Sequence, residues 1–297
     1  MFPARANGSF RSWGFVDAAD PASALELEEL STRLAAFYQK EAGNQGYWER
    51  AEAGSAVWRP ETHPFHCHLA SLISSTATVV DFGCGTAHAI RNLQTGTRYI
   101  GIEGSEATVS SNRARFPEHR FIHGNMLADH GLSGQADWAV SFFAIEHCIR
   151  PDLLLSRMYE CCKPGGRIAL LCPNAETGMN SLRSGWSAIS KREKMRRLRL
   201  VDLLASVVEE RWIWPRRVEA IHRSSIAFPI YLKPRCLDAP YWSDNDAVYM
   251  ATERKLEAFL RGLGCEIDPA SASAPQPELR GAIIYLIAQK PPTALAR

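Results

Sequence analysis

The chain has 297 residues, of which 46% are hydrophobic and 22% charged, which suits a large α/β domain with additions. The formal net charge of +2 gives no general reason to expect a nucleic-acid partner. The eight cysteines form no C-x-x-C pair and no zinc-finger spacing, which indicates reduced thiols. The first residues lack the apolar run of a signal peptide, and no segment is apolar enough to span a membrane. We therefore expect a cytoplasmic protein.

The first segment, residues 1–70, is expected to form an N-terminal arm and a helical cap. Gly, Pro and scattered aromatic residues predict an irregular arm over residues 1–20. An apolar stripe at helical spacing then predicts a helix over 23–40, and a second helix is expected over 66–74.

The second segment, residues 71–174, alternates between short apolar runs and helical patterns. Strands are expected at 78–82, 98–103, 119–123, 136–142 and 167–172. Helices are expected at 87–94, 105–115 and 151–162. This alternation indicates an α/β fold with a doubly wound, mostly parallel sheet covered by helices on both faces.

The third segment, residues 175–250, does not continue the alternation and is interpreted as an inserted cap that contributes to substrate binding. It contains a basic helical stretch, 191–210, and a Trp-, Pro- and Arg-rich patch at 212–217. The last segment, 251–297, is expected to complete the core with a helix and a terminal strand hairpin at the sheet edge.

The most informative stretch is TVVDFGCGTA, residues 78–87, in which a buried strand runs into the turn Gly83-Cys84-Gly85. Glycines at such a turn let the backbone approach a ligand closely, which predicts a nucleoside-bearing cofactor at the strand end. Glu103 ends the next strand, where a carboxylate can accept both ribose hydroxyls. Asn125 and Met126 follow the third strand and suit an adenine ring, although Asn125 alone is equally typical of an ordinary loop.

These residues resemble the class I S-adenosylmethionine-dependent methyltransferases, especially the group that acts on small molecules. The segments that carry the resemblance are VVDFGCGTA, YIGIEGSE, FIHGNM, ADWAVSFFAIEH and LLLSRMYECCKPGGRIALLCPN. The resemblance covers about residues 70–175 well and 250–290 more loosely. Ala87 departs from it, because a third glycine is common there, and so does Asn125, because an acidic residue is more usual.

The resemblance implies a seven-stranded Rossmann-like methyltransferase sheet and S-adenosylmethionine as the methyl donor. It implies that Gly83 and Gly85 lie against the methionine part of the donor, that Glu103 holds the ribose, and that Asn125 and Met126 contact the adenine. The full set of expected donor-binding residues is Asp81, Gly83, Cys84, Gly85, Glu103, Gly104, Asn125, Met126 and Phe142.

A dehydrogenase is the nearest rival for the glycine turn. The spacing here is G-x-G-x-x-H, since His88 stands at the last glycine position of the dinucleotide-binding pattern. Neither Glu146-His147 nor the KPGG turn at 163–166 has a role in a dehydrogenase, so we do not favour this interpretation.

Glu146-His147 follows the fourth strand, where loops face the ligand crevice in sheets of this kind. His147 is the candidate catalytic base, since a neutral imidazole can take a proton from an attacking hydroxyl or amine. The alternative is that His147 orients a loop or caps a helix. Some relatives bind a divalent metal through E-x-x-E-H, but Phe143 occupies the first acidic position here, so no metal is predicted.

Three further groups have both a functional and a structural interpretation. His63, His66 and His68 surround Cys67, and contact with the donor or substrate, or packing, is favoured over a metal site. The basic segment 191–200 fits a solvated or substrate-facing helix better than RNA or an anionic membrane. Substrate contacts are expected at Glu146, Trp242, Asp244 and Asp246, although Asp and Asn also serve turns and caps.

The sequence thus predicts an S-adenosylmethionine-dependent methyltransferase for an acidic or partly apolar small molecule, with O-methylation favoured over N- or C-methylation. Two alternatives stay open, both based on the basic 191–200 segment. One is an RNA-modifying methyltransferase, and the other is a non-catalytic protein that binds RNA or another protein.

Overall fold

The computed structural model describes residues 7–42, 63–177, 195–196, 200–234, 246–272 and 281–292. The chain divides into two compact units, which are described separately. Unit 1 comprises Met1–Glu52, Glu146–Ile149 and Asn174–Thr252. Unit 2 comprises Ala53–Ile145, Arg150–Pro173 and Glu253–Arg297.

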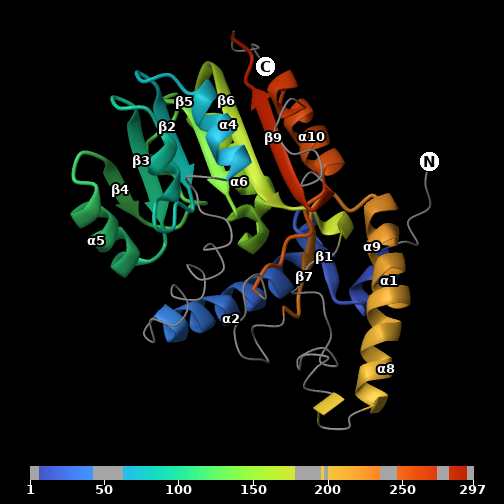
Figure 1. The fold of residues 1–297 in the computed structure, drawn as a ribbon. Coiled ribbons are helices and arrows are strands. Elements are labelled where there is room, and N and C mark those ends of the chain that lie inside the picture. Colours follow the sequence, from blue (N-terminus) through green and yellow to red (C-terminus); the bar gives the residue numbers. More distant parts are fainter. Residues whose placement is uncertain are drawn as a thin grey trace. The chain divides into compact units, whose positions relative to one another are not determined.

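Unit 2 contains a seven-stranded sheet with the order β4-β3-β2-β5-β6-β9-β8 (Figure 1). Its strands are β2 (Thr78–Phe82), β3 (Arg98–Glu103), β4 (Arg120–His123), β5 (Ala136–Phe142), β6 (Cys162–Pro173), β8 (Glu266–Ile267) and β9 (Ile283–Gln289). The first five strands in this order pair in parallel, whereas β9 runs antiparallel to both β6 and β8. The expected seven-stranded, mostly parallel sheet with a terminal hairpin is confirmed.

Helices cover both faces of this sheet, as the side-chain alternation of the strands requires. The helices are α4 (Pro64–Leu72), α5 (Glu106–Arg115), α6 (Pro151–Cys161) and α10 (Glu253–Gly262). Val79 and Val140 face α4 and line one cavity with it. Phe82 and Ile102 point to the other face and line a second cavity with α6. The sheet is therefore doubly wound.

The central strand β2 is buried along its whole length, as expected for a parallel strand covered on both faces. Its Val79 belongs to an apolar core with Trp138 of β5 and Leu171 of β6. Phe65 of α4 stacks on Tyr285 of β9, with ring centroids 4.9 Å apart, so the core extends to the antiparallel edge of the sheet.

The turn after β2 differs from expectation. The predicted helix over 87–94 is a 3-10 helix, η2 (His88–Asn92), preceded by Ala87 at φ 57° and ψ 42°. A left-handed backbone is costly for a residue with a Cβ, and this explains why glycine is common at this position among the proteins that the chain resembles.

Unit 1 is built from helices around a two-stranded antiparallel sheet. Its elements are α1 (Asn7–Ser12), β1 (Phe15–Asp17), η1 (Pro21–Ser23), α2 (Ala24–Ala42), η4 (Ala175–Thr177), α8 (Leu200–Val208), the π-helix η7 (Glu209–Ile213), α9 (Trp214–Arg223) and β7 (Pro229–Tyr231). The prediction of an irregular arm was wrong for residues 7–17, because they form α1 and β1, and β1 pairs with β7 and places Phe15 opposite Tyr231. Trp214 packs on both rings, which makes this sheet part of the core of unit 1.

Several predicted features fall outside the described residues, among them Trp242, Asp244 and most of the basic 191–200 segment. Within the described part of the chain, no helix combines the length and apolar character that crossing a membrane requires.

Candidate active site

The glycine turn after β2 lies where the strand order reverses. The chain proceeds from β2 through β3 to β4 on one side, and β5 then pairs on the other side of β2. A crevice outside the carboxyl ends of the strands forms at such a reversal. Gly83 at φ 78° and Gly85 at φ 51° make the turn at this edge.

The space around Gly83 shows why a glycine stands there. A Cβ on Gly83 would lie 2.6 Å from the Cβ of Ala144, which follows β5, and 3.5 Å from the Sδ of Met126, which follows β4. The turns after three strands therefore meet at Gly83. The side chain of Cys84 packs against β3, where a Cβ on Gly101 would lie 2.6 Å from the Cys84 Sγ. Cys84 therefore contributes its backbone to the turn.

Glu103 holds the turn from the end of β3. Its Oε2 accepts a hydrogen bond from the Gly85 N–H at 3.0 Å, and its Oε1 accepts one from the Ser105 N–H at 2.9 Å. Burial raises the pKa of Glu103, while these backbone donors act in the opposite direction. Asn112 of α5 is fully buried and donates from Nδ2 to the Gly85 carbonyl at 2.7 Å. The sequence analysis did not identify Asn112, whose only signal is a polar residue on the buried face of a helix.

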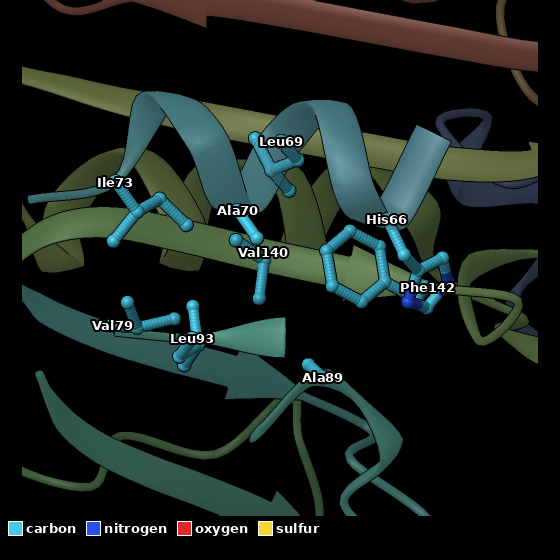
Figure 2. Close-up of a pocket in the computed structure, with 9 residues that line it drawn as sticks. All are labelled: His66, Leu69, Ala70, Ile73, Val79, Ala89, Leu93, Val140 and Phe142. Atoms are coloured by element: carbon cyan, nitrogen blue, oxygen red, sulfur yellow. The ribbon is translucent and has the colours of Figure 1, made fainter. Parts of the chain in front are cut away.

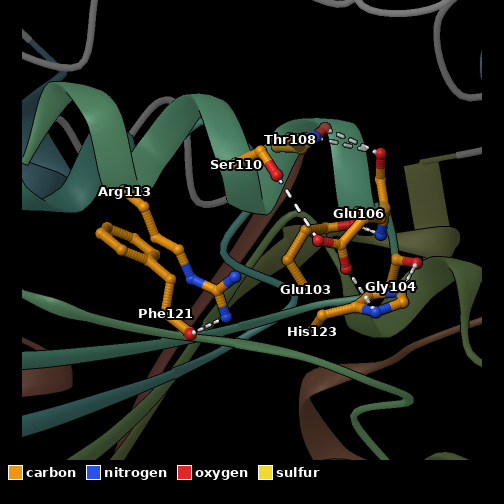
Figure 3. A network of polar contacts seen from close by, with 9 residues as sticks. Glu103, Gly104, Glu106, Thr108, Ser110, Arg113, Phe121 and His123 are labelled. Atoms are coloured by element: carbon orange, nitrogen blue, oxygen red, sulfur yellow. Dashed lines mark hydrogen bonds and ion pairs between the residues drawn. The ribbon is translucent and has the colours of Figure 1, made fainter.

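A polar network surrounds Glu103 at the start of α5 (Figure 3). Nδ1 of His123 lies 2.6 Å from Oε2 of Glu106, and Nε2 of His123 lies 3.1 Å from the Gly104 carbonyl oxygen. A Cβ on Gly104 would meet nothing within 4 Å, so the space beside this residue is open. The network ties the ends of β3 and β4 to α5.

Asp81 is a buried carboxyl directly before the turn, with 3% of its surface exposed. The Tyr99 hydroxyl donates a hydrogen bond to its Oδ2 at 2.6 Å. Its Oδ1 is buried and has no hydrogen-bond partner among the described residues. Burial raises the pKa of Asp81 to about 7, against the lowering effect of Tyr99 and with a further increase from the charge of Glu103.

Asn125 lies in a turn after β4 and is exposed. Its Oδ1 accepts a hydrogen bond from the Leu127 N–H at 3.0 Å, and its carbonyl oxygen lies 2.9 Å from Nε2 of His130. This arrangement is typical of an Asx turn. The contact of Asn125 with an adenine ring stays a prediction.

Two of the predicted histidines pack beside the end of β5. The rings of His63 and His66 lie 4.9 Å apart, and His66 lies 4.8 Å from Phe142. Burial lowers the pKa of His63 to about 4 and that of His66 to about 3, with a further decrease for His66 from His63 and then His88. Over the described residues, no cluster of three or more His, Cys, Asp or Glu side chains is arranged to hold a metal ion.

Figure 2 shows that His66 and Phe142 line a cavity between α4 and the sheet. Its volume is about 10 Å³, enough for about one water molecule. This cavity is therefore a packing gap between α4 and the sheet and too small for a substrate.

In unit 1, His147 and Asp246 lie together. Nδ1 of His147 is 3.1 Å from Oδ2 of Asp246, and the Tyr38 hydroxyl donates to the same oxygen at 2.7 Å. Burial favours the neutral form of Asp246, but His147 and the hydrogen bonds from His147 and Tyr38 outweigh it and hold the pKa of Asp246 below its ordinary value. Glu146 is fully buried, and its carbonyl oxygen accepts hydrogen bonds from the backbone.

Comparisons with known proteins bear on the family and the fold. A family described as a methyltransferase domain matches residues 47–269. A protein of Mycolicibacterium smegmatis named as a probable S-adenosylmethionine-dependent methyltransferase is 31% identical over 100 residues, which are 33% of this chain and 39% of that protein. A trans-aconitate 2-methyltransferase of Paracidovorax citrulli is 30% identical over 118 residues, 38% of this chain and 45% of that protein. The chain thus spans less than half the length of these curated relatives.

Among solved structures, the fold is similar to that of 1,6-didemethyltoxoflavin-N1-methyltransferase from Burkholderia thailandensis, which was solved with 1,6-didemethyltoxoflavin and S-adenosylhomocysteine. The two align with a TM-score of 0.50 and 14% identity over 93% of this chain and 95% of that one. At this level of identity the likeness concerns the fold alone.

Proposed function

The chain belongs to the methyltransferase domain family, the class I S-adenosylmethionine-dependent methyltransferases, and from this membership we propose that it transfers a methyl group from S-adenosylmethionine to a small molecule. The observation that carries the proposal is the glycine turn at the strand-order reversal, held by Glu103 and Asn112. The named activity of one relative, on trans-aconitate, supports a small-molecule acceptor.

The residues around the turn fit the donor. We assign the methionine part to Gly83 and Gly85, whose positive φ values form a turn that residues with a Cβ rarely adopt. The carboxylate of Glu103 has lone pairs beyond those used by Gly85 and Ser105, and these can accept ribose hydroxyls. Oδ1 of Asp81 is a buried acceptor without a partner among the described residues, which suits a cationic ligand group.

The remaining donor contacts stay part of the proposal. Met126 packs against the turn through its Sδ, next to the space we assign to the adenine. Asn125, Gly104, Cys84 and Phe142 complete the proposed set, with Cys84 acting through its backbone.

The bound donor supplies a methyl group on a positively charged sulfur, which is already activated for transfer. The chain therefore has to align the acceptor and exclude water. We propose that His147 accepts the proton of an attacking hydroxyl, which favours O-methylation over N- or C-methylation. Asp246 supports this role, because a carboxylate beside an imidazole stabilises the charge that the ring acquires.

Acceptor selection is assigned to unit 1, where the described chain departs most from the resemblance. We keep Glu146, Trp242 and Asp244 as proposed contributors to acceptor binding. An RNA acceptor stays the alternative, but the net charge of +2 offers little of the electrostatic attraction on which RNA binding depends.

Donor binding by Glu103→Ala and by the control Glu106→Ala tests the proposal. Isothermal titration with S-adenosylmethionine should show a loss of about 10- to 100-fold for Glu103→Ala, as expected when hydrogen bonds to a charged group are removed. Glu106 lies three residues away, has an exposed side chain and pairs with His123, so its removal should change the affinity less than about 3-fold. Equal affinity of Glu103→Ala and wild type, or binding of NAD instead, would contradict the proposal.

The acceptor class is then tested by transfer of a tritiated methyl group to bulk RNA and, separately, to small-molecule extracts. Incorporation into the small-molecule fraction alone is the expected result. Incorporation into RNA alone would overturn the acceptor class and leave the donor site intact.

A further inference from the structure

The helix α8 of unit 1 and the π-helix η7 that follows it carry an exposed apolar stripe. Its side chains recur at intervals of four residues, as Leu200, Leu204, Val208 and Trp212. Side chains at this spacing lie on one face of a helix. Their exposed fractions range from 48% for Val208 to 66% for Leu204. Single exposed apolar residues are common on proteins, but a continuous exposed stripe indicates a surface that binds a partner.

The next part of the same helical segment has a covered apolar face. The elements α8, η7 and α9 follow one another without a break (Figure 1). In α9, Trp214 and Val218 are buried and belong to the apolar core of unit 1 together with Phe15. The apolar side chains of α9 therefore serve the core of unit 1, whereas the stripe on α8 and η7 is exposed.

Basic residues adjoin both ends of the stripe. Arg196, four residues before Leu200, is exposed. At the other end, the guanidinium of Arg216 lies over the Trp212 ring, 5.8 Å from its centroid. Residues 191–217 contain nine Lys or Arg and four Asp or Glu, so their formal net charge is +5, whereas that of the whole chain is +2. The segment that carries the stripe is therefore more positive than the rest of the chain.

We propose that the stripe binds the surface of a membrane that contains anionic lipids. A helix at such a surface buries its apolar face between the head groups and the acyl chains, and adjacent Lys and Arg attract the acidic head groups. Trp212 suits the level of the head groups, where tryptophan is enriched, and Arg216 over its ring can pair with a phosphate. Binding of this kind is peripheral and does not depend on the methyl transfer proposed above.

Charge and apolar character together favour a membrane over the other occupants of such a face. A second copy of the chain would bring two segments of net charge +5 together, which repel each other. RNA matches the charge, but its phosphate backbone offers no apolar phase for the stripe. The sequence favoured a solvated helix, because the spacing of apolar residues does not show whether they are covered.

Sedimentation of the complete chain with lipid vesicles tests the proposal. Vesicles of equal parts phosphatidylcholine and phosphatidylglycerol should bind the chain, and vesicles of phosphatidylcholine alone should bind it about 10-fold more weakly. Leu204→Glu puts a charge in the middle of the stripe and should weaken binding to the anionic vesicles by about 10-fold or more. Leu25→Glu is the matched control, because Leu25 lies on α2 of unit 1 and is 67% exposed. It should bind within about 2-fold of wild type.

A second measurement reports whether Trp212 enters the lipid. Anionic vesicles with brominated acyl chains should quench part of the tryptophan fluorescence of wild type. Trp212→Phe keeps an apolar ring at this position and should bind within about 3-fold of wild type. The quenched part of the fluorescence should be smaller in this variant.

Each outcome supports or overturns the proposal. Binding to anionic vesicles that is weakened in Leu204→Glu and kept in Leu25→Glu supports it. No sedimentation of wild type, or equal sedimentation of the two variants, overturns it, and so does a dimer in light scattering that Leu204→Glu separates. If Leu204→Glu lacks the circular dichroism spectrum of wild type, the quenching decides, and unchanged quenching in Trp212→Phe overturns the proposal. Loss of S-adenosylmethionine binding would overturn the proposed function and leave this surface untouched.

Discussion

Two aspartates, one in each unit, are almost completely buried, and the pKa values of their carboxyl groups are shifted in opposite directions. Asp81 in unit 2 has one neutral donor, Tyr99, and the charge of Glu103 nearby, and its pKa rises to about 7. Asp246 in unit 1 has both His147 and Tyr38 as partners, and its pKa falls below the ordinary value. Burial removes solvating water from both carboxylates and raises the pKa of each. The neighbouring groups therefore decide the net direction of each pKa shift.

The opposite pKa shifts follow from what surrounds each carboxylate. Asp246 lies beside two side-chain partners of unit 1, since its Oδ2 is 3.1 Å from Nδ1 of His147 and accepts the Tyr38 hydroxyl at 2.7 Å. Asp81 keeps one oxygen without a partner among the described residues, directly before the glycine turn. The cost of burying an oxygen without a hydrogen bond is offset when a ligand supplies a hydrogen-bond donor or a positive charge.

Blocking the glycine turn should give the largest effect and tests whether the Asp81 region is the ligand site. In Gly83→Val the new Cβ would lie 2.6 Å from the Cβ of Ala144, at a φ of 78° that β-branched residues avoid. We expect S-adenosylmethionine affinity to fall about 1,000-fold, or about 4 kcal/mol, in isothermal titration.

Gly262→Ala is the control for that variant, because a Cβ there meets nothing within 4 Å. It should bind the donor like wild type. A Gly83→Val protein with a wild-type circular dichroism spectrum and unchanged affinity would remove the glycine turn from the proposed site.

Removing the charge of Asp81 should have the next largest effect. Because its folded-state pKa is about 7, above the unfolded value of about 4, the folded chain binds more protons between these pH values. The stabilisation from Asp81 is therefore present below pH 4 and is lost as the pH rises through 7. In urea unfolding, wild type should lose on the order of 3 kcal/mol relative to Asp81→Asn between pH 4 and pH 8. Parallel pH profiles for the two proteins would contradict the raised pKa.

Much of unit 2 could be predicted from the sequence because its strands are short, apolar and buried on both faces. The strand expected at 136–142 is β5 to the residue, and the strand expected at 119–123 is β4, which begins one residue later and ends at the same residue. The strand β1 was missed because it pairs with β7, more than 200 residues away, and a three-residue strand has no local signal. The turn Gly83–Gly85 and Glu103 were chosen as candidates because donor binding requires these residue types, and their role in binding stays a prediction.

The residues that sequence analysis missed act through tertiary contacts. Asn112 and Tyr99 hold the turn and Asp81 from positions that resemble ordinary helix and strand residues. Tyr38 reaches Asp246 across 208 positions of the chain. Asp246 was expected to contact the substrate; it is fully buried, and its contact with a substrate stays a prediction. Spacing along the chain indicates the chemistry of a site but not which side chains support it.

Asp246→Asn should change the free energy of unfolding less than Asp81→Asn does, and in the opposite direction. A lowered folded-state pKa means that Asp246 stabilises the fold above the unfolded pKa of about 4 and that this contribution is lost as the pH falls further. At pH 8, Asp246→Asn should lower the free energy of unfolding by about 2 kcal/mol, the usual worth of a hydrogen bond to a charged group. At the same pH, Asp81→Asn should raise it. If both variants shifted the free energy of unfolding at pH 8 in the same direction, burial alone would govern the two carboxylates, and the contrast between their neighbours would fail.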